Sequence, residues 1–199
     1  MHPHPGYAWK DEGEMRAFLS EVSFSTIFVC GAAGPMLVHA PVVVQGRDRL
    51  RFHVSRANRT VASLDGAQAL ISCIGPDAYV SPDWYGTPDQ VPTWNYLAVE
   101  CEGPLRHLDE TELTQLLDDL GDAQEGRLAP KPIWSRAKMT PGKFDSMLKA
   151  IIGFEMRIDA IRGTRKLGQM KTRDERRAAA AGVAGTGNAT MAALMMPAE

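Results

Sequence analysis

The sequence lacks the short motifs that mark the commonest nucleotide and hydrolase sites. It contains no glycine-rich GxGxxG or P-loop segment, no HExxH and no GxSxG, so a Rossmann site, a zincin centre and a hydrolase nucleophile elbow are not expected. Cysteine is scarce, because only Cys30, Cys73 and Cys101 occur and no CxxC pair is among them. This odd, widely spaced set argues against a disulfide framework and a metal site, and it favours a reducing compartment.

Long apolar runs and an excess of one charge are also missing. No run approaches the roughly 20 apolar residues that span a bilayer, so no membrane contact is expected. Residues 1–6 are polar and proline-rich, without the layout of a signal peptide, and the expected location is the cytoplasm. Lys and Arg total 22 against 24 Asp and Glu, a net charge of -2. Any nucleic-acid role would therefore need a local basic patch.

The chain is long enough for one well-buried core. It has 199 residues, of which 44% are hydrophobic and 23% charged, as in ordinary globular proteins. Composition changes after Ile161, where a basic segment is followed by an Ala- and Met-rich one. We therefore expect a main domain over residues 1–161 and a helical C-terminal extension over 162–199.

Hydrophobic periodicity predicts short strands with few helices. Helical spacing is found in 11–22, in a segment that starts at Asp109 with a capping box to Glu112, and in one that starts at Thr140 and Pro141. Strand patterns are predicted at 24–30, 36–44, 50–54, 67–74, 93–105 and 153–161. This arrangement indicates an α+β, mainly β protein, built on an antiparallel barrel with peripheral helices.

The corner Ser55–Thr60 has the equipment to hold a phosphate. It follows the alternating strand 50–54 and contains Arg56, Asn58 and Arg59 beside two hydroxyl groups. Guanidinium groups bind phosphate in bidentate fashion, and a strand-to-helix corner can offer backbone N–H groups. When the segment is considered alone, a solvated polar turn is the favoured explanation.

Two further segments are candidates for ligand contact. In His39-Ala40-Pro41 the proline removes a ladder hydrogen bond from an apolar strand, which marks an edge or a bulge where backbone can face a ligand. The aromatic residues of 79–85 and 91–96 could wall a flat ligand. Packing of a long loop explains the aromatic residues as well, and His39 alone is more often structural.

The segment 162–177 is locally basic. It carries seven Lys and Arg residues against Asp174 and Glu175, so it could contact a phosphate, a partner or DNA. A solvated helix face is the commoner explanation. No helix-turn-helix pattern surrounds the segment, so reading of the major groove has little support.

Several motifs together resemble those of the PaiB-like family, described as FMN-binding negative transcriptional regulators. The matching stretches occur in order over nearly the whole chain. They are Leu37–Pro41, Phe52–Asn58, Gly75–Tyr85, Val91–Tyr96 and Ile152–Glu155. The segment Lys166–Met170 departs from the family pattern, because Gly168 and Met170 stand where members usually carry Ser and Asn.

The resemblance implies an FMN-binding split β-barrel, related to pyridoxamine-phosphate oxidases and flavin reductases, with a C-terminal helical tail. It also implies a homodimer whose two FMN sites lie at the subunit interface. The phosphate would bind at the corner Ser55–Thr60, and Trp94 and Asn95 would approach from the same or the partner subunit. The implied cofactor-binding residues are His39, Ala40, Pro41, His53, Val54, Ser55, Arg56, Asn58, Arg59, Thr60, Trp94, Asn95, Lys166 and Gln169.

Three functions remain open at this point. The resemblance favours a flavin-linked negative transcriptional regulator, with a possible DNA contact through 162–177. The kinship to flavin reductases favours an FMN-dependent oxidoreductase that acts on an unknown small molecule. The third alternative is a barrel that has exchanged flavin for haem or a small aromatic molecule, with His39 or His53 as the haem ligand.

Overall fold

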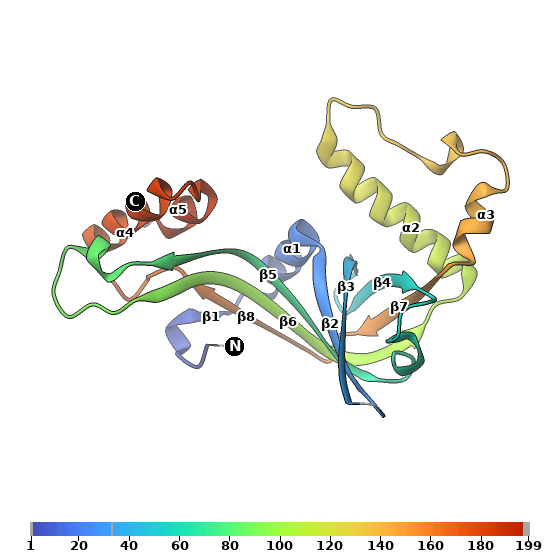
Figure 1. Cartoon of the computed structure of the whole chain (residues 1–199), viewed down its shortest axis with the longest axis horizontal. Coiled ribbons are helices and arrows are strands. Elements are labelled where there is room, and N and C mark those ends of the chain that lie inside the picture. The colour runs from blue at the N-terminus through green and yellow to red at the C-terminus, as the bar shows by residue number, and fades with distance from the viewer. Residues whose placement is uncertain (1, 33, 197–199) are drawn as a thin grey trace. The chain divides into compact units, whose positions relative to one another are not determined.

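The computed structural model describes residues 2–32 and 34–196 and contains a mainly antiparallel sheet with helices beside it (Figure 1). Its strands are β1 (Ala8–Trp9), β2 (Phe24–Gly31), β3 (Gly34–Gln45), β4 (Arg49–Ser55), β5 (Gln68–Val80), β6 (Thr93–His107), β7 (Ile151–Arg157) and β8 (Ala160–Lys166). The strand order is β1-β8-β6-β5-β2-β3-β4-β7, and β6 also pairs with β7. The predicted α+β class with an antiparallel sheet is confirmed.

The helices agree with the sequence periodicity at most positions. They are α1 (Glu12–Val22), α2 (Glu110–Glu125), α3 (Lys143–Leu148), α4 (Arg173–Gly185) and α5 (Ala189–Met195). The predicted capping box of α2 is present, since Asp109 and Glu112 exchange side-chain-to-backbone hydrogen bonds of 3.1 and 2.8 Å. The helical C-terminal tail is likewise confirmed. None of the helices among the described residues is long and apolar enough to cross a membrane.

Three predicted boundaries are wrong. The strand expected at 153–161 is two strands, because Ile158 and Asp159 leave the ladder and donate their backbone N–H groups to Asp48 and Glu102. β5 continues to Val80, beyond the end predicted at 74. α3 begins at Lys143 rather than at Thr140-Pro141. The backbone of its N-cap, Gly142, is in the left-handed region, so the right-handed helix can begin only after it.

The chain forms two compact units that share the longer strands. The first comprises residues 1–15, 74–99 and 162–199, and the second comprises 16–73 and 100–161. We call them the terminal unit and the central unit. In the terminal unit, α4 and α5 each bury apolar side chains. The Trp84 ring lies so close to Gly182 of α4 that a Cβ added at this glycine would come within 2.3 Å of the ring.

The core of the central unit lies between paired strands. Phe52 of β4 and Phe154 of β7 are register partners, and their fully buried rings stack at 5.7 Å. α2 covers the opposite face, where Leu113 and Leu116 pack with Leu108 and Leu148. Figure 1 shows α2 beside β4 and β7 in this unit. The alternation of β4 therefore sends Phe52 into the core and the neighbouring His53 toward the helices.

A buried carboxylate joins three strands of the central unit. Glu155 of β7 is the register partner of Arg51 on β4 and of Arg106 on β6. Its oxygens accept hydrogen bonds from Arg51 at 2.6 Å and from Arg106 at 2.9 Å. Arg106 also donates to Glu112 of α2 at 2.6 and 2.9 Å, which lowers the pKa of Glu112 to about 2. This network fixes β7 between its neighbours and ties α2 to them.

We expect Glu155→Gln to lower the free energy of unfolding by about 2–3 kcal/mol, because it leaves two guanidinium groups without their shared carboxylate. Urea unfolding, followed by circular dichroism, measures the change. Glu21→Gln, at an exposed position, is the control and should change the free energy little. Equal effects of the two substitutions would contradict the role given to Glu155.

Candidate functional site

The predicted strand edge at His39-Ala40-Pro41 is present. Residues 34–41 of β3 pair with β2, whereas the pairing with β4 begins only at Val42. Pro41 therefore lies where β3 changes partner, and among the described residues no strand pairs with the other edge of 34–41. This edge leaves backbone groups available, as a proline in a strand indicates.

The face of β2 and β3 that carries His39 is apolar and exposed. Phe28 and Leu37 are direct cross-strand neighbours with 38% and 48% of their surface exposed, and Phe24 is 62% exposed. The His39 ring stacks on Phe24 at 6.2 Å, and its Nδ1 lies 3.1 Å from the Thr26 hydroxyl. Large side chains in such a continuous patch indicate an interaction surface. Ala40 points the opposite way and is buried.

The corner Ser55–Thr60 is a tightly bonded turn. Asn58 Oδ1 accepts from the Thr60 N–H at 3.0 Å and from the Thr60 hydroxyl at 2.8 Å. The N–H groups of Arg56 and Asn58 donate to the carbonyls of Ala150 and Ser55. The expectation that these backbone groups are free is therefore wrong, because the turn uses them itself. Val54 is buried as part of the alternating strand.

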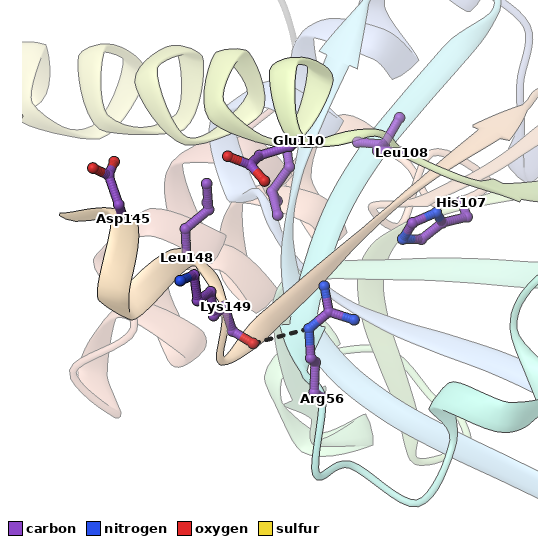
Figure 2. Close-up of a pocket in the computed structure, with 8 residues that line it drawn as sticks. Arg56, His107, Leu108, Glu110, Asp145, Leu148 and Lys149 are labelled. Atoms are coloured by element: carbon purple, nitrogen blue, oxygen red, sulfur yellow. Dashed lines mark hydrogen bonds between the residues drawn. The ribbon is translucent and has the colours of Figure 1, made fainter. Parts of the chain in front are cut away.

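The two arginines of the corner differ in their surroundings. Arg56 donates to the Lys149 carbonyl at 2.9 Å and lines a small cavity of about 120 Å³ (Figure 2). That cavity mixes basic with acidic groups, among them His107 and Glu110. Arg59 is exposed, and no hydrogen bond or ion pair holds its guanidinium among the described residues. Arg59 is thus the cation of the corner that is available to a bound anion.

His53 lies at a different place. Its ring lines a separate apolar cavity of the central unit, together with residues of α2 and α3. Burial lowers the pKa of His53, which favours the neutral form of the ring. The family resemblance implied that His53 binds the cofactor together with the corner. Strand alternation instead directs the His53 side chain toward the helices.

A cavity of about 220 Å³ lies within the terminal unit and contains two of the predicted residues, Asn95 and Lys166. Lys166 donates to the Thr93 hydroxyl at 2.5 Å and lies over the Tyr7 ring at 5.6 Å. Burial lowers the pKa of Lys166. Lys171 bonds Gln90 and lies 4.9 Å from the centre of the Tyr85 ring. The cavity therefore combines aromatic walls with two ammonium groups.

Asn95 is the unusual residue of this cavity. Its side chain is only 1% exposed, yet neither Oδ1 nor Nδ2 has a hydrogen-bond partner among the described residues. A buried amide without partners costs about 1–3 kcal/mol. Gly168 borders it, with φ of +76°, and a Cβ there would lie 3.7 Å from Nδ2. This left-handed backbone explains why glycine suits position 168.

Two other predicted residues of the terminal unit do not line the cavity. Trp94 is 55% exposed and meets the Tyr79 ring edge-on at 6.2 Å. The Gln169 amide is bonded within the chain, since it accepts from the Leu167 N–H at 2.7 Å and donates to the carbonyls of Arg165 and Gly6 at 2.6 and 3.0 Å. The aromatic residues of the two motifs thus have three different surroundings. Tyr85 lines the cavity, Tyr79 and Trp94 form an exposed pair, and Trp84 packs on α4.

Among the residues of this cavity that sequence reasoning missed are two aromatic side chains and one cation. Tyr7 lies in the N-terminal segment, which carries no motif, and Lys171 was only one cation of a basic stretch. Tyr85 was noticed as an aromatic residue without a defined position. Only the fold brings these distant segments together, and no spacing in the sequence signals it.

Comparison with known proteins identifies related sequences and folds. The family model described as "Putative FMN-binding domain" matches residues 1–160. The "Protease synthase and sporulation protein PAI 2" of Bacillus subtilis (strain 168) is 29% identical over 160 residues, which cover 78% of this chain and 76% of that protein.

Two solved structures share the fold. The FAD and heme binding protein from Mycobacterium smegmatis has a TM-score of 0.61 at 18% identity, covering 81% of this chain and 74% of its own. The flavocytochrome Anf3 from Azotobacter vinelandii has a TM-score of 0.62 at 16% identity, with coverages of 84% and 73%. At these identities the likeness concerns the fold alone.

We expect Asn95→Leu to raise the free energy of unfolding of the ligand-free protein by about 1–3 kcal/mol, because it replaces an unpaired buried amide by an apolar group of similar size. Urea unfolding measures it. The matched control is Asn58→Leu, which should destabilise, since the Asn58 amide is bonded. A loss of stability in Asn95→Leu as large as in Asn58→Leu would contradict the description of Asn95.

Proposed function

Because the chain belongs to the FMN-binding domain family, we propose that it is a homodimeric FMN-binding protein whose flavin occupancy controls a regulatory function. The observation that carries this proposal is the unpaired, buried amide of Asn95 beside two lysines. Native proteins retain few such groups, and a ligand that completes their hydrogen bonds is a physical reason to retain one.

The terminal-unit cavity fits the polar edge of a flavin ring. That edge alternates hydrogen-bond donors with acceptors, and a side-chain amide such as Asn95 offers both. Lys166 and Lys171 would place positive charge near the ring, where charge tunes the electronics of a flavin. Tyr7 and Tyr85 supply apolar walls for a flat ligand.

The corner Ser55–Thr60 could hold the phosphate mainly through its side chains. Its backbone N–H groups are largely engaged, so side chains would hold the anion. Arg59 offers an unengaged guanidinium, and Ser55 adds a hydroxyl at the exposed end of β4. A charge-assisted hydrogen bond from guanidinium to phosphate is among the stronger ones in proteins.

Bound FMN would supply hydride or electron transfer. Within the terminal unit, the chain's own contribution would be to hold the ring edge at Asn95 and to keep two cations close to it. Within the central unit, Arg59 would offer its guanidinium to a phosphate. Reduction of the protein-bound flavin by NADH or NADPH, followed by its visible absorption, distinguishes an FMN-dependent oxidoreductase from a flavoprotein that only regulates.

The exposed face of β2 and β3 supports the homodimer. Phe24, Phe28 and Leu37 form a continuous apolar patch on the same face as His39. A second copy of the chain would cover this patch and bring its residues beside the strand edge at 39–41. Burial of large apolar side chains is the main driving force of such an association.

A direct contact of residues 162–177 with DNA gains little support from the side chains. Arg165 pairs with Glu14 at 3.2 Å, and Arg176 donates to the Met195 carbonyl at 3.2 Å. Lys166 and Lys171 face the terminal-unit cavity. These cations have intramolecular roles, so the proposed regulation depends on flavin binding rather than on reading of the groove.

We expect Arg59→Ala to weaken FMN binding by about 1.5–3 kcal/mol, the value of a hydrogen bond to a charged group. Arg56→Ala removes the same charge from the same turn but should cost much less, because Arg56 is bonded to the Lys149 carbonyl. Quenching of flavin fluorescence in equilibrium titrations measures both. Equal losses would mean that the corner acts only by its net charge.

Mixing two variants tests whether each site is shared between subunits. Arg59→Ala and Asn95→Leu proteins are each expected to bind FMN poorly. In a mixed dimer with shared sites, one site would combine both substitutions and the other would have neither. Unfolding and refolding the two together should therefore restore up to one tight site per mixed dimer. If mixing restores none although mixed dimers form, each site lies within a single subunit.

A further inference from the structure

The central unit contains a second, larger cavity that the proposed flavin site does not use. Its volume is about 400 Å³, within the range of small-molecule pockets. It lies among α2, α3 and the segment 134–139, and the ends of β4 and β7 close its base. The side chains that argue for a ligand are His53, Leu117, Trp134, Met139, Phe144 and Met147.

Its lining suits an aromatic molecule. Trp134 and Met147 are 44% and 53% exposed beside the half-buried Phe144, so the apolar surface is accessible from outside. Methionine side chains adapt to aromatic rings and contact them favourably. A flat apolar ligand would remove this surface from water and gain roughly in proportion to the area buried.

The charges around this cavity cancel. Arg136 and Asp118 form an ion pair of 3.0 Å, and the Arg136 guanidinium lies over the Phe144 ring at 5.0 Å. Burial lowers the pKa of His53 and so favours its neutral form. No net charge is left to attract a carboxylate or an ammonium group, so the lining favours a neutral ligand.

One polar group in this lining is unpaired. Nδ1 of His53 is buried and has no hydrogen-bond partner among the described residues. Neutral imidazole has one donor and one acceptor nitrogen. Here no hydrogen bond to Nδ1 determines which of the two nitrogens carries the hydrogen. A ligand with one hydrogen-bonding group could complete the imidazole at the base of the cavity.

We propose that this cavity binds a small, neutral, planar aromatic molecule whose single N–H or O–H group donates a hydrogen bond to the His53 imidazole. The site is distinct from the proposed flavin site, because its lining includes none of Arg59, Asn95 and Lys166. It therefore stands or fails independently of FMN binding.

Titration calorimetry with the purified protein, before and after addition of FMN, tests the proposal, with indole as the probe and 1-methylindole as the analogue that lacks the N–H donor. We expect indole to bind roughly 3- to 10-fold more tightly, the ratio that one hydrogen bond gives. In His53→Phe the two should bind equally. Absence of indole binding in the native protein, or an unchanged preference in His53→Phe, would overturn the proposal.

Two further variants keep the test decisive if His53→Phe does not fold. Met147→Trp fills the cavity from the surface of α3 and should weaken both probes at least tenfold. Met170→Trp makes the same exchange at an exposed methionine of the terminal unit and should leave binding unchanged. Equal effects of the two variants would show that indole binds elsewhere. Displacement of indole by added FMN would likewise contradict a separate site.

Discussion

The Glu155 carboxylate is the interaction on which the central unit depends. It is buried between Arg51 and Arg106, so β4, β7 and β6 share a single register at this level. A slip by one residue would exchange the core face of β4 for the helix-facing one. The register thereby fixes where β4 ends and turns into the corner, and it directs His53 toward α2 and α3. Glu112 extends the network to the first turn of α2, where it also completes the capping box.

Within residues 2–32 and 34–196, two side chains hold buried polar atoms without a hydrogen-bond partner, and each side chain borders a cavity. Asn95 lies in the terminal unit, and His53 lies in the central unit. Each costs the folded protein free energy that an apolar residue would not. Proteins tolerate such costs at sites where a ligand completes the bonding. The same physical argument therefore supports both proposals, the flavin at Asn95 and the aromatic ligand at His53. The neighbouring charges differ, because lysines lie beside Asn95 whereas the lining around His53 has no net charge.

The sequence predicted local features well where one short-range rule decided them. The capping box at Asp109 and the alternation of 50–54 are examples, since both depend on neighbouring residues only. The strand edge at Pro41 was also predicted, because proline cannot donate to a ladder. The break between β7 and β8 was missed because long-range bonds cause it: Asp48 and Glu102 accept from Ile158 and Asp159. The engagement of the corner N–H groups was missed for a similar reason, since Ala150 accepts from Arg56.

By itself the sequence determined the class of fold, the family and the residue types of a phosphate corner, because periodicity and motif order are properties of the chain. It also predicted Asn95 and Lys166 as members of a flavin site. Only the tertiary structure places Tyr7, Tyr85 and Lys171 in one cavity with these two residues, bonds Gln169 to backbone groups and places His53 in another cavity. The physical reason is that burial and hydrogen-bond satisfaction depend on segments far apart in the chain, which no local pattern encodes.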